Sequence, residues 1–359
     1  MNISEDGPMF YPLKFQPVYK DYLWGGRNLT KLGRKLPPGI IAESWEVSTH
    51  PDGFSVIANG EFKGKTLTAW LEQFGGAALG TAMIDRFHNQ FPLLVKLIDA
   101  KQQLSVQVHP DDEYARQYES GYGKNEIWYI VDAQPGAHII YDFTPGTTRI
   151  VFEKAVQEGR IGDCLQQVPV APGDAFDIPA GTVHGIGAGI IIAEIQQSSN
   201  LTYRLYDYDR VDQSGNKRPL HIDQALAVAD FDSIGRRPQL AGLKIRKGLD
   251  NQTRYLVANQ FFAVESTELN GTINEIATGD RFYLYLFLKG SGTIRYAGGQ
   301  VVIQTPEAVF IPAKLGEYSI QGNLQFLKAY LPDLQQQIIE PLREAGYDEA
   351  TIRETLCIR

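Results

Sequence analysis

Short runs of β-branched and aromatic residues alternate with glycine, proline and polar turn residues along most of the chain. Such runs are typical of the strands of a β-sandwich or barrel. The clearest predicted strands are residues 91–98, 103–109, 126–131, 138–143, 175–178 and 190–195. Helical periodicity extends over two or three turns at a time, and it predicts short helices at residues 67–74, 111–118, 149–158, 222–231 and 333–345. The pattern therefore indicates a mainly β fold with a few short helices.

An internal repeat suggests that the β structure is built twice. Residues 126–136 and 173–186 resemble residues 282–292 and 306–320, and each copy contains a strand, a glycine turn and a later strand that ends in Ile-Pro-Ala. Two copies of one double-sheet unit explain the repeat, with chance similarity of two short strand pairs as the alternative. In the second copy a hydrophobic run stands opposite Glu126, so we expect that copy to keep the packing pattern without the polar groups.

A break in the pattern at residues 232–243 marks the predicted domain boundary, and all candidate chemistry precedes it. We expect residues 1–237 to form a first domain that binds metal and carries helical insertions. Residues 238–332 are expected to form a second domain without metal, and residues 333–359 a C-terminal helical segment. A proline-aspartate pair opens the helix predicted in this last segment, and a glycine closes it.

The composition is that of a globular protein, and it constrains the partners. The 359 residues include 34 Lys+Arg and 42 Asp+Glu, which gives a formal net charge of −8, and 43% of them are hydrophobic. An acidic balance argues against a nucleic-acid or anionic membrane surface, because both need clustered positive charge. A small anionic substrate needs only a few local cations and is compatible with this charge. The most apolar stretch, residues 186–195, is far shorter than the ~20 residues of a membrane helix.

Targeting and redox signals favour the cytoplasm. The first eight residues carry two acids and no basic region, and no apolar segment follows, which argues against a secretory signal. Cys164 and Cys357 lie far apart in the sequence, and neither belongs to a CxxC pattern. A disulfide framework is therefore not expected, and the cytoplasm is the default location.

One predicted strand carries an unusual row of polar side chains. Ser105, Gln107 and His109 alternate with Val106 and Val108. Because strand side chains alternate between the two faces of a sheet, the hydroxyl, amide and imidazole share one face and the valines share the other. A face with these three groups does not build a hydrophobic core, so it is a candidate for a functional site.

Two further residues complete a candidate metal site. Glu126 opens a strongly apolar strand, where a carboxylate is costly to bury without a positive partner, and His184 follows the Pro-Ala-Gly turn after another strand. Together with Gln107 and His109 they offer four ligands to a borderline divalent ion, for which Zn²⁺ is the best match. The alternative is that each is an ordinary hydrogen-bonded residue of the core or surface.

Basic residues add candidates for catalysis and substrate binding. Lys124 lies two residues before Glu126, so it can share the same strand face and act as a base, or it can be a solvated loop residue. Arg204 lies within an aromatic strand, and its guanidinium suits a phosphate or an enediolate oxygen. A structural pair of Arg204 with Asp207 or Asp209 is the alternative.

Other basic residues carry weaker signals. Lys96 and Arg210 are expected at the surface, although either could supply charge for a phosphate. His50 and His138 are expected to have structural roles.

Several motifs together resemble a known family. They are WGG at Trp24, ESWEVSTHPDG from Glu43, LSVQVHPDDEYA from Leu104, KNEIWYIV from Lys124, IPAGTVHGI from Ile178 and EIQQSSNLTYRLYDYDR from Glu194. These motifs are similar to those of type I mannose-6-phosphate isomerases of the shorter bacterial kind, which belong to the cupin superfamily. The resemblance is specific over about the first two thirds of the chain, and the last third fits the second cupin domain of that family more loosely. It implies two cupin, or jelly-roll, domains.

The resemblance also implies roles for individual residues. The zinc ligands of the family would fall on Gln107, His109, Glu126 and His184, with one Zn²⁺ per chain, and its active-site arginine would fall on Arg204. The positions proposed in the family for substrate or phosphate contact match Ser105, Lys124, Glu194 and Arg210. We take Arg204 and Lys124 as catalytic, and Ser105, Glu194 and Arg210 as substrate-binding.

One departure from the family pattern concerns the base. Some members carry an aspartate four residues before the arginine, where this chain has Asn200. An amide cannot accept a proton as a base does. The proton would then be transferred by Lys124, His50, a metal-bound water or another carboxylate such as Glu194.

The implied reaction is the interconversion of mannose 6-phosphate and fructose 6-phosphate through a cis-enediol. The substrate is thus a small phosphosugar, and the sequence leaves the oligomeric state open. Two other functions fit the same residues. His109, Glu126 and His184 could form the iron site of a cupin oxygenase, but an extra Gln107 ligand and nearby cations argue against open positions for oxygen. A non-catalytic sugar-binding cupin is the third hypothesis, and an isomerase assay would distinguish it.

Overall fold

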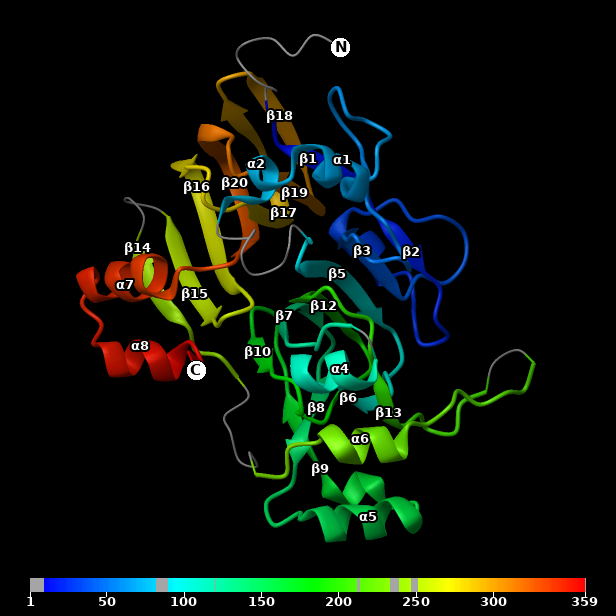
Figure 1. Cartoon of the computed structure of the whole chain (residues 1–359). Helices are drawn as coiled ribbons and strands as arrows, with labels where there is room; N and C mark the ends of the chain where they lie inside the picture. Colours follow the sequence, from blue (N-terminus) through cyan, green and yellow to red (C-terminus); the bar gives the residue numbers. More distant parts are fainter. Residues whose placement is uncertain are drawn as a thin grey trace.

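A computed structural model describes residues 10–81, 90–119, 121–211, 214–232, 239–246 and 251–358. Within these residues the fold is mainly β and consists of antiparallel sheets stacked on one another, with short helices on the outside (Figure 1). The order of the layers places helices α5 and α6 at one end, followed by a five-stranded, a six-stranded and a nine-stranded sheet. No helix in the described part of the chain is long and apolar enough to span a membrane.

The first two sheets form the sandwich that contains the predicted site. The five-stranded sheet has the order β13 (Tyr203–Tyr206), β6 (Val106–Val108), β11 (His184–Ile186), β8 (His138–Phe143) and β9 (Leu165–Pro169). The six-stranded sheet has the order β10 (Ala175–Ile178), β7 (Glu126–Ala133), β12 (Ile190–Gln197), β5 (Leu93–Ala100), β3 (Glu43–Val47) and β2 (Val18–Lys20). A buried aromatic and aliphatic cluster that includes Trp128, Phe176 and Ile192 fills the space between them.

The third sheet belongs mostly to the C-terminal part of the chain. Its order is β14 (Leu243–Arg246), β15 (Gln252–Ala258), β16 (Ala263–Ala277), β20 (Gly316–Tyr330), β17 (Tyr283–Tyr296), β19 (Glu307–Ile311), β1 (Leu13–Gln16) and β4 (Val56–Ile57), and β18 (Gly299–Gln304) pairs with β17. The N-terminal strand β1 pairs with β19, Leu13 opposite Phe310, although the two are far apart in the sequence. The division of the chain at residue 237 did not anticipate this pairing, and residue 237 itself lies outside the described residues.

The predicted helices are present with small differences in their ends. They are α1 (Leu67–Phe74), α4 (Asp112–Tyr118), α5 (Arg149–Gln157) and α6 (Ile222–Val228); α2 (Gly76–Leu79), η1 (Asn28–Leu32) and η2 (Ile161–Cys164) are additional short helices. Asp111 caps α4, because its carboxylate accepts a hydrogen bond of 2.8 Å from the Tyr114 N–H.

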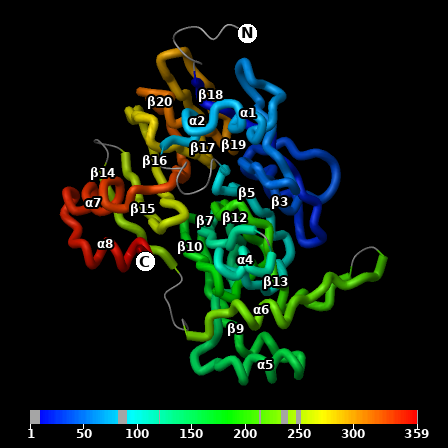
Figure 2. Tube along the Cα trace, in the orientation of Figure 1, coloured from blue at the N-terminus to red at the C-terminus, as the bar shows by residue number. Residues whose placement is uncertain are grey.

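The C-terminal segment differs from the single helix predicted at 333–345. It begins as a π-helix, Leu334–Ile339, continues as α7 (Glu340–Glu344), and ends in α8 (Glu349–Thr355), which lies beyond the helix predicted at 333–345 but within the helical segment expected at 333–359. Pro341 has no N–H to donate to the preceding turn, which explains why regular α-helical bonding is interrupted there. Figure 2 shows this segment beside β14 and β15, where the Ala258 N–H donates a 3.0 Å hydrogen bond to the Leu356 carbonyl.

The internal repeat is visible in the pairing of the strands. In the first copy β7 lies between β10 and β12, and in the second copy β17 lies between β19 and β20. At matching ladder positions, the first copy pairs Glu194 with Lys96 and the second copy pairs Lys328 with Glu265. The second copy therefore keeps a buried acid and a buried base at facing ladder positions with the charges exchanged, although Lys328 forms its ion pair with Glu275, at 2.8 Å; we had expected the polar groups of this copy to be lost.

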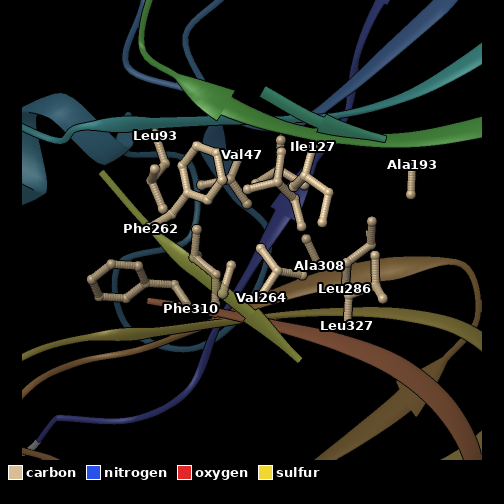
Figure 3. Packing of buried hydrophobic residues seen from close by; sticks show 14 of the residues in the cluster. Val47, Leu93, Ile127, Ala193, Phe262, Val264, Leu286, Ala308, Phe310 and Leu327 are labelled. Atoms are coloured by element: carbon tan, nitrogen blue, oxygen red, sulfur yellow. The ribbon is translucent and has the colours of Figure 1, made fainter. Parts of the chain in front are cut away.

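The six-stranded and nine-stranded sheets pack face to face through alternate residues of their strands. Figure 3 shows Ile127 and Ala193 of the six-stranded sheet facing Leu286 and Leu327 of the nine-stranded sheet. Because side chains alternate, the neighbours of Ile127 on β7, Glu126 and Trp128, point to the opposite side, into the first sandwich. The packing between the sheets thus fixes which side chains face the site.

This packing predicts a large loss of stability when one of its side chains is truncated. Leu286 is 2% exposed, so Leu286→Ala should lower the free energy of unfolding by about 2–5 kcal/mol through lost burial and a residual cavity. Ile276→Ala is the control, because Ile276 is 52% exposed and should change stability by less than ~0.5 kcal/mol. Chemical denaturation of both variants measures the difference, and equal midpoints would contradict this view of the interface.

Candidate metal centre and pocket

The predicted metal ligands come from the two facing sheets of the first sandwich. Gln107 on β6 pairs with His184 on β11 and with Arg204 on β13, and His109 follows β6 directly. Glu126 is the first residue of β7 in the opposite sheet. The structure therefore brings together residues that are distant in sequence, as the sequence analysis predicted.

The alternation along β6 is confirmed. Val106 and Val108 are fully buried in the layer beneath the outer helices, together with Phe152 of α5 and Ala225 of α6. The Gln107 side chain lies on the other face of the strand, next to His184. A strand with period-two polarity thus presents its polar side to the interior of the sandwich because its apolar side is covered by helices.

The two imidazoles and the carboxylate form a tight buried cluster. Nε2 of His109 lies 3.7 Å from Glu126 Oε1, and Nε2 of His184 lies 3.3 Å from the same oxygen. The candidate ligand atoms of the three residues all lie within 4.8 Å of one another. The Gln107 amide joins the cluster, with its Nε2 3.4 Å from His184 Nε2. In the described ranges this is the one group of three or more His, Cys, Asp or Glu residues with such geometry.

The surroundings orient His184 for ligation. Its Nδ1 lies 2.9 Å from the Thr182 carbonyl, which accepts a hydrogen bond from Nδ1–H and leaves the lone pair of Nε2 facing Glu126. The edge of the Trp128 ring packs against the imidazole, with the ring centroids 5.3 Å apart. A histidine whose second nitrogen is fixed by a backbone carbonyl is a common arrangement at metal sites.

Burial and charge set the protonation states that a metal requires. Burial lowers the pKa of His109 to about 3, helped by the nearby Lys124 ammonium, and burial also lowers the pKa of His184. Burial alone would raise the pKa of Glu126, but Lys124, whose Nζ is 2.8 Å from Oε2, and the two imidazoles hold it well below its usual range. At neutral pH the cluster therefore offers two neutral nitrogens and one anionic oxygen.

The donor set fits a divalent cation. Glu126 is completely buried, and its Oε1 meets no hydrogen-bond donor with suitable geometry among the described residues. A buried carboxylate oxygen that faces two neutral imidazole nitrogens is poorly solvated and needs a positive partner. Two nitrogens, one carboxylate and one amide are ligands that Zn²⁺ accepts.

A pocket of about 310 Å³ opens beside this cluster. Its size is at the lower end of the range for small-ligand sites. Seven residues that were considered for the site from the sequence line it: Lys96, Ser105, Gln107, Lys124, Glu194, Asn200 and Arg204. The sequence suggested no role in the site for the others: Tyr22, Trp24, Glu43, Ile98, Leu104, Ile186, Thr202 and Arg218.

Lys96 is buried, whereas we expected it at the surface. It is 3% exposed and lines the pocket, with its Nζ 3.0 Å from Glu194 Oε2 and 3.7 Å from Glu43 Oε2. Burial lowers the pKa of Lys96, but the two carboxylates outweigh burial and raise it overall, so the ammonium stays charged. β5 is buried on both faces, and its polar and apolar residues do not alternate. The direction of the Lys96 side chain could therefore not be predicted from the sequence pattern. The cost of burying a charge in an apolar strand was the signal that could have identified it.

Arg210 is not among the residues that line the pocket. Its Nη2 bonds to the Asp207 carboxylate, and its Nη1 donates to the Gln103 carbonyl at 2.5 Å. Arg204 does line the pocket: its Nη1 donates a 2.8 Å hydrogen bond to the Pro219 carbonyl, and its buried Nε meets no acceptor in the described part of the chain. The pairing with Asp207 that we considered for Arg204 is made by Arg210 and Arg218 instead.

His50 does not line the pocket. It lines a different cavity, and its ring packs against Trp45 with centroids 6.0 Å apart. Asn200 Nδ2 donates a 2.6 Å hydrogen bond to Asp52 Oδ2 at the pocket's edge. Of the candidate protein bases, Lys124 and Glu194 therefore line the pocket and His50 does not.

The fold and the site define a cupin with a candidate metal centre in its first sandwich, and comparisons with known proteins agree. Residues 12–134 match the family model described as phosphomannose isomerase type I, catalytic domain, and residues 251–331 match mannose-6-phosphate isomerase, cupin domain. The mannose-6-phosphate isomerase ManA of Bacillus subtilis is 38% identical over 323 residues, which cover 89% of this chain and 99% of the relative. The enzyme of Streptococcus mutans is 35% identical, covering 90% and 99%.

The structural comparison gives the same result. The crystal structure of the mannose 6-phosphate isomerase from Bacillus subtilis superposes with a TM-score of 0.81 and 31% sequence identity, over 89% of this chain and 99% of the other. The chain therefore belongs to the type I phosphomannose isomerase family, as the sequence motifs indicated.

Proposed function

We propose that the protein is a zinc-dependent isomerase that interconverts mannose 6-phosphate and fructose 6-phosphate through a cis-enediol. The observation that carries the proposal is the buried cluster of His109, Glu126 and His184 beside a pocket lined by lysine and arginine side chains. The printed names of the relatives, which are mannose-6-phosphate isomerases, supply the substrate class. Gln107, His109, Glu126 and His184 would hold one Zn²⁺ per chain. When bound, the ion would supply electrophilic polarisation of a substrate oxygen.

The reaction moves a proton between C2 and C1 of the open-chain sugar. The C2 proton is weakly acidic, and removing it places negative charge on an oxygen of the enediolate. Arg204 lines the pocket half-buried, and its guanidinium would stabilise this oxyanion in the transition state. Ser105 and Glu194 line the same pocket, and we assign them to the sugar hydroxyls. Trp128 Nε1 holds the Glu194 carboxylate in place with a 3.1 Å hydrogen bond.

Lys124 has the position for the proton transfer. It is 4% exposed, it lines the pocket, and its Nζ lies 3.0 Å from His109 Nε2, so it reaches both the cluster and the space for the sugar. Because Lys124 is an ammonium in its pair with Glu126, it would have to release one proton first; the neutral amine would then accept the C2 proton and return it to C1. Asn200 cannot perform this step, and His50 lies in another cavity.

Removal of the metal tests this proposal. We expect the purified protein to convert mannose 6-phosphate in a coupled isomerase assay, to lose at least ~99% of this activity on chelation, and to recover it with Zn²⁺, because the oxyanion loses its main electrophile. Full activity in metal-depleted protein would contradict zinc dependence. Iron in elemental analysis with oxygen consumption would instead support an oxygenase, and tight phosphosugar binding without turnover would support a binding protein.

We also propose the cytoplasm as the location, on the basis of the sequence. The support is that Cys164 and Cys357 belong to no CxxC pattern, so a disulfide framework is not expected. A small phosphosugar is the proposed partner.

A further inference from the structure

The cations of the pocket fall into two groups. Lys96 and Lys124 are 3% and 4% exposed and are paired with carboxylates, Lys96 with Glu194 at 3.0 Å and Lys124 with Glu126 at 2.8 Å. Arg204 and Arg218 line the same pocket but are partly exposed, Arg218 by 31%. The lysines therefore lie at the buried end, beside the metal cluster, and the arginines lie on the solvent side.

The solvent side carries an excess of positive charge. Arg204, Arg210 and Arg218 surround one carboxylate, that of Asp207, which is 5% exposed. Asp207 pairs with Arg210 and Arg218, so it cannot neutralise all three guanidiniums. Lys217 forms a separate exposed ion pair with Asp209, so it neither adds to nor reduces the positive charge of the three arginines. A site that retains surplus positive charge beside a pocket is suited to an anion.

Asp207 also fixes the direction of Arg218. The Nε of Arg218 donates to Asp207 Oδ2 at 2.7 Å, and its Nη2 donates to Oδ1. This fork-to-fork contact holds the planar guanidinium by one edge and leaves Nη1 outside the pair. Arg204 is tied to the same segment, because its Nη1 donates to the carbonyl of Pro219, the residue after Arg218. Both guanidiniums are thus positioned before any ligand binds.

We propose that Arg218 binds the phosphate of the substrate and that Asp207 is the residue that positions it. The inference rests on the proposed function, in which C1 and C2 react at the metal end of the pocket while the phosphate is attached at C6. The two ends of the open-chain sugar then match the two ends of the pocket. The phosphate takes no part in the chemistry, and its binding energy holds the reacting carbons in place. Arg210, which we assigned to the substrate from the sequence, does not line the pocket and shares the Asp207 carboxylate with Arg218.

The test compares Arg218→Gln with Lys217→Gln in the full-length protein. Both substitutions remove one positive charge from neighbouring residues, but only Arg218 lines the pocket, and Lys217 is 62% exposed. For Arg218→Gln we expect kcat/KM for mannose 6-phosphate to fall by about 10- to 100-fold, the value of a lost charge-assisted hydrogen bond. Turnover of unphosphorylated mannose and zinc content should stay unchanged. Arg218→Lys should recover part of the loss, because it keeps the charge without the fork. Lys217→Gln should behave like the unmodified protein.

Calorimetry with inorganic phosphate provides a readout that does not need turnover. We expect phosphate to bind the unmodified protein and Lys217→Gln alike, and to bind Arg218→Gln at least ~10-fold more weakly. Equal phosphate affinity and equal kcat/KM in Arg218→Gln would overturn the proposal, as would an equal loss of activity on mannose and mannose 6-phosphate. Absence of isomerase activity in the unmodified protein would refute the proposed function instead, and the phosphate titration would still decide the role of Arg218.

Discussion

Replacing His109 by alanine should remove the bound metal and the isomerase activity together. The imidazole of His109 is neutral near pH 7, because burial lowers its pKa to about 3, and its Nε2 faces the Glu126 carboxylate at 3.7 Å. Alanine removes one of two nitrogen donors from the cluster. Loss of a residue that merely supports a ligand costs about 10- to 100-fold in metal affinity, and loss of the ligand itself should cost more.

The fold should survive this substitution. Glu126 keeps the Lys124 ammonium at 2.8 Å, so its buried charge is not left alone. His138→Ala is the matched control, because His138 lies on β8 away from the cluster and should retain metal and activity. Elemental analysis and the isomerase assay, made on the same preparations, give the comparison. Full activity with retained metal in His109→Ala would show that the ligand set is wrong.

Replacing Arg204 by alanine should separate catalysis from metal binding. We expect kcat to fall by about 10²- to 10³-fold or more, because a donor aimed at a developing oxyanion contributes that much in enzymes. Zinc content should stay the same, since Arg204 is not part of the cluster of candidate ligand atoms. Its guanidinium is held by the Pro219 carbonyl at 2.8 Å, and its Nε is buried without an acceptor in the described residues, which leaves it available to a substrate oxygen.

A surface arginine serves as the control for Arg204. Arg160 is exposed and pairs with Glu158 and Asp163 far from the pocket, so Arg160→Ala should leave kcat unchanged. An Arg204→Ala protein with a full complement of zinc and normal turnover would remove Arg204 from the catalytic residues. A variant that has lost its zinc would show that Arg204 supports the metal centre instead.

The parts of the site that could be predicted from sequence depend on local periodicity. Gln107 and His109 alternate with Val106 and Val108, and the structure confirms that the valines face the helices. The period of a strand relates neighbours by simple geometry, so one apolar face implies the direction of the other. The isolated charge of Glu126 at the head of an apolar strand was informative for a similar reason, since its burial is costly.

The burial of Lys96 could not be predicted from periodicity. β5 has one face against the nine-stranded sheet and the other toward the pocket, so both faces are apolar around Lys96 and the pattern has no period to interpret. Strands buried on both sides appear as continuous apolar runs. The partners of Lys96, Glu43 and Glu194, come from two other strands, and only their pairing with β5 brings them together.

Long-range pairing explains the other differences. The addition of β1 to the sheet of the C-terminal half depends on contacts between Leu13 and Phe310, which no local pattern encodes. Arg218 lies in an irregular segment after β13, without periodicity, and its position is set by Asp207. In the repeat, similar packing patterns identified corresponding strands in the two copies, but the exchange of Lys96 and Glu194 for Glu265 and Lys328 appeared only with the ladder register.

The proposed zinc centre can be located by anomalous X-ray scattering at the zinc absorption edge, on crystals grown from an active preparation. We expect one strong peak per chain, surrounded by the side chains of Gln107, His109, Glu126 and His184. An active preparation whose crystals show no peak among these four residues, or a peak elsewhere, would contradict it.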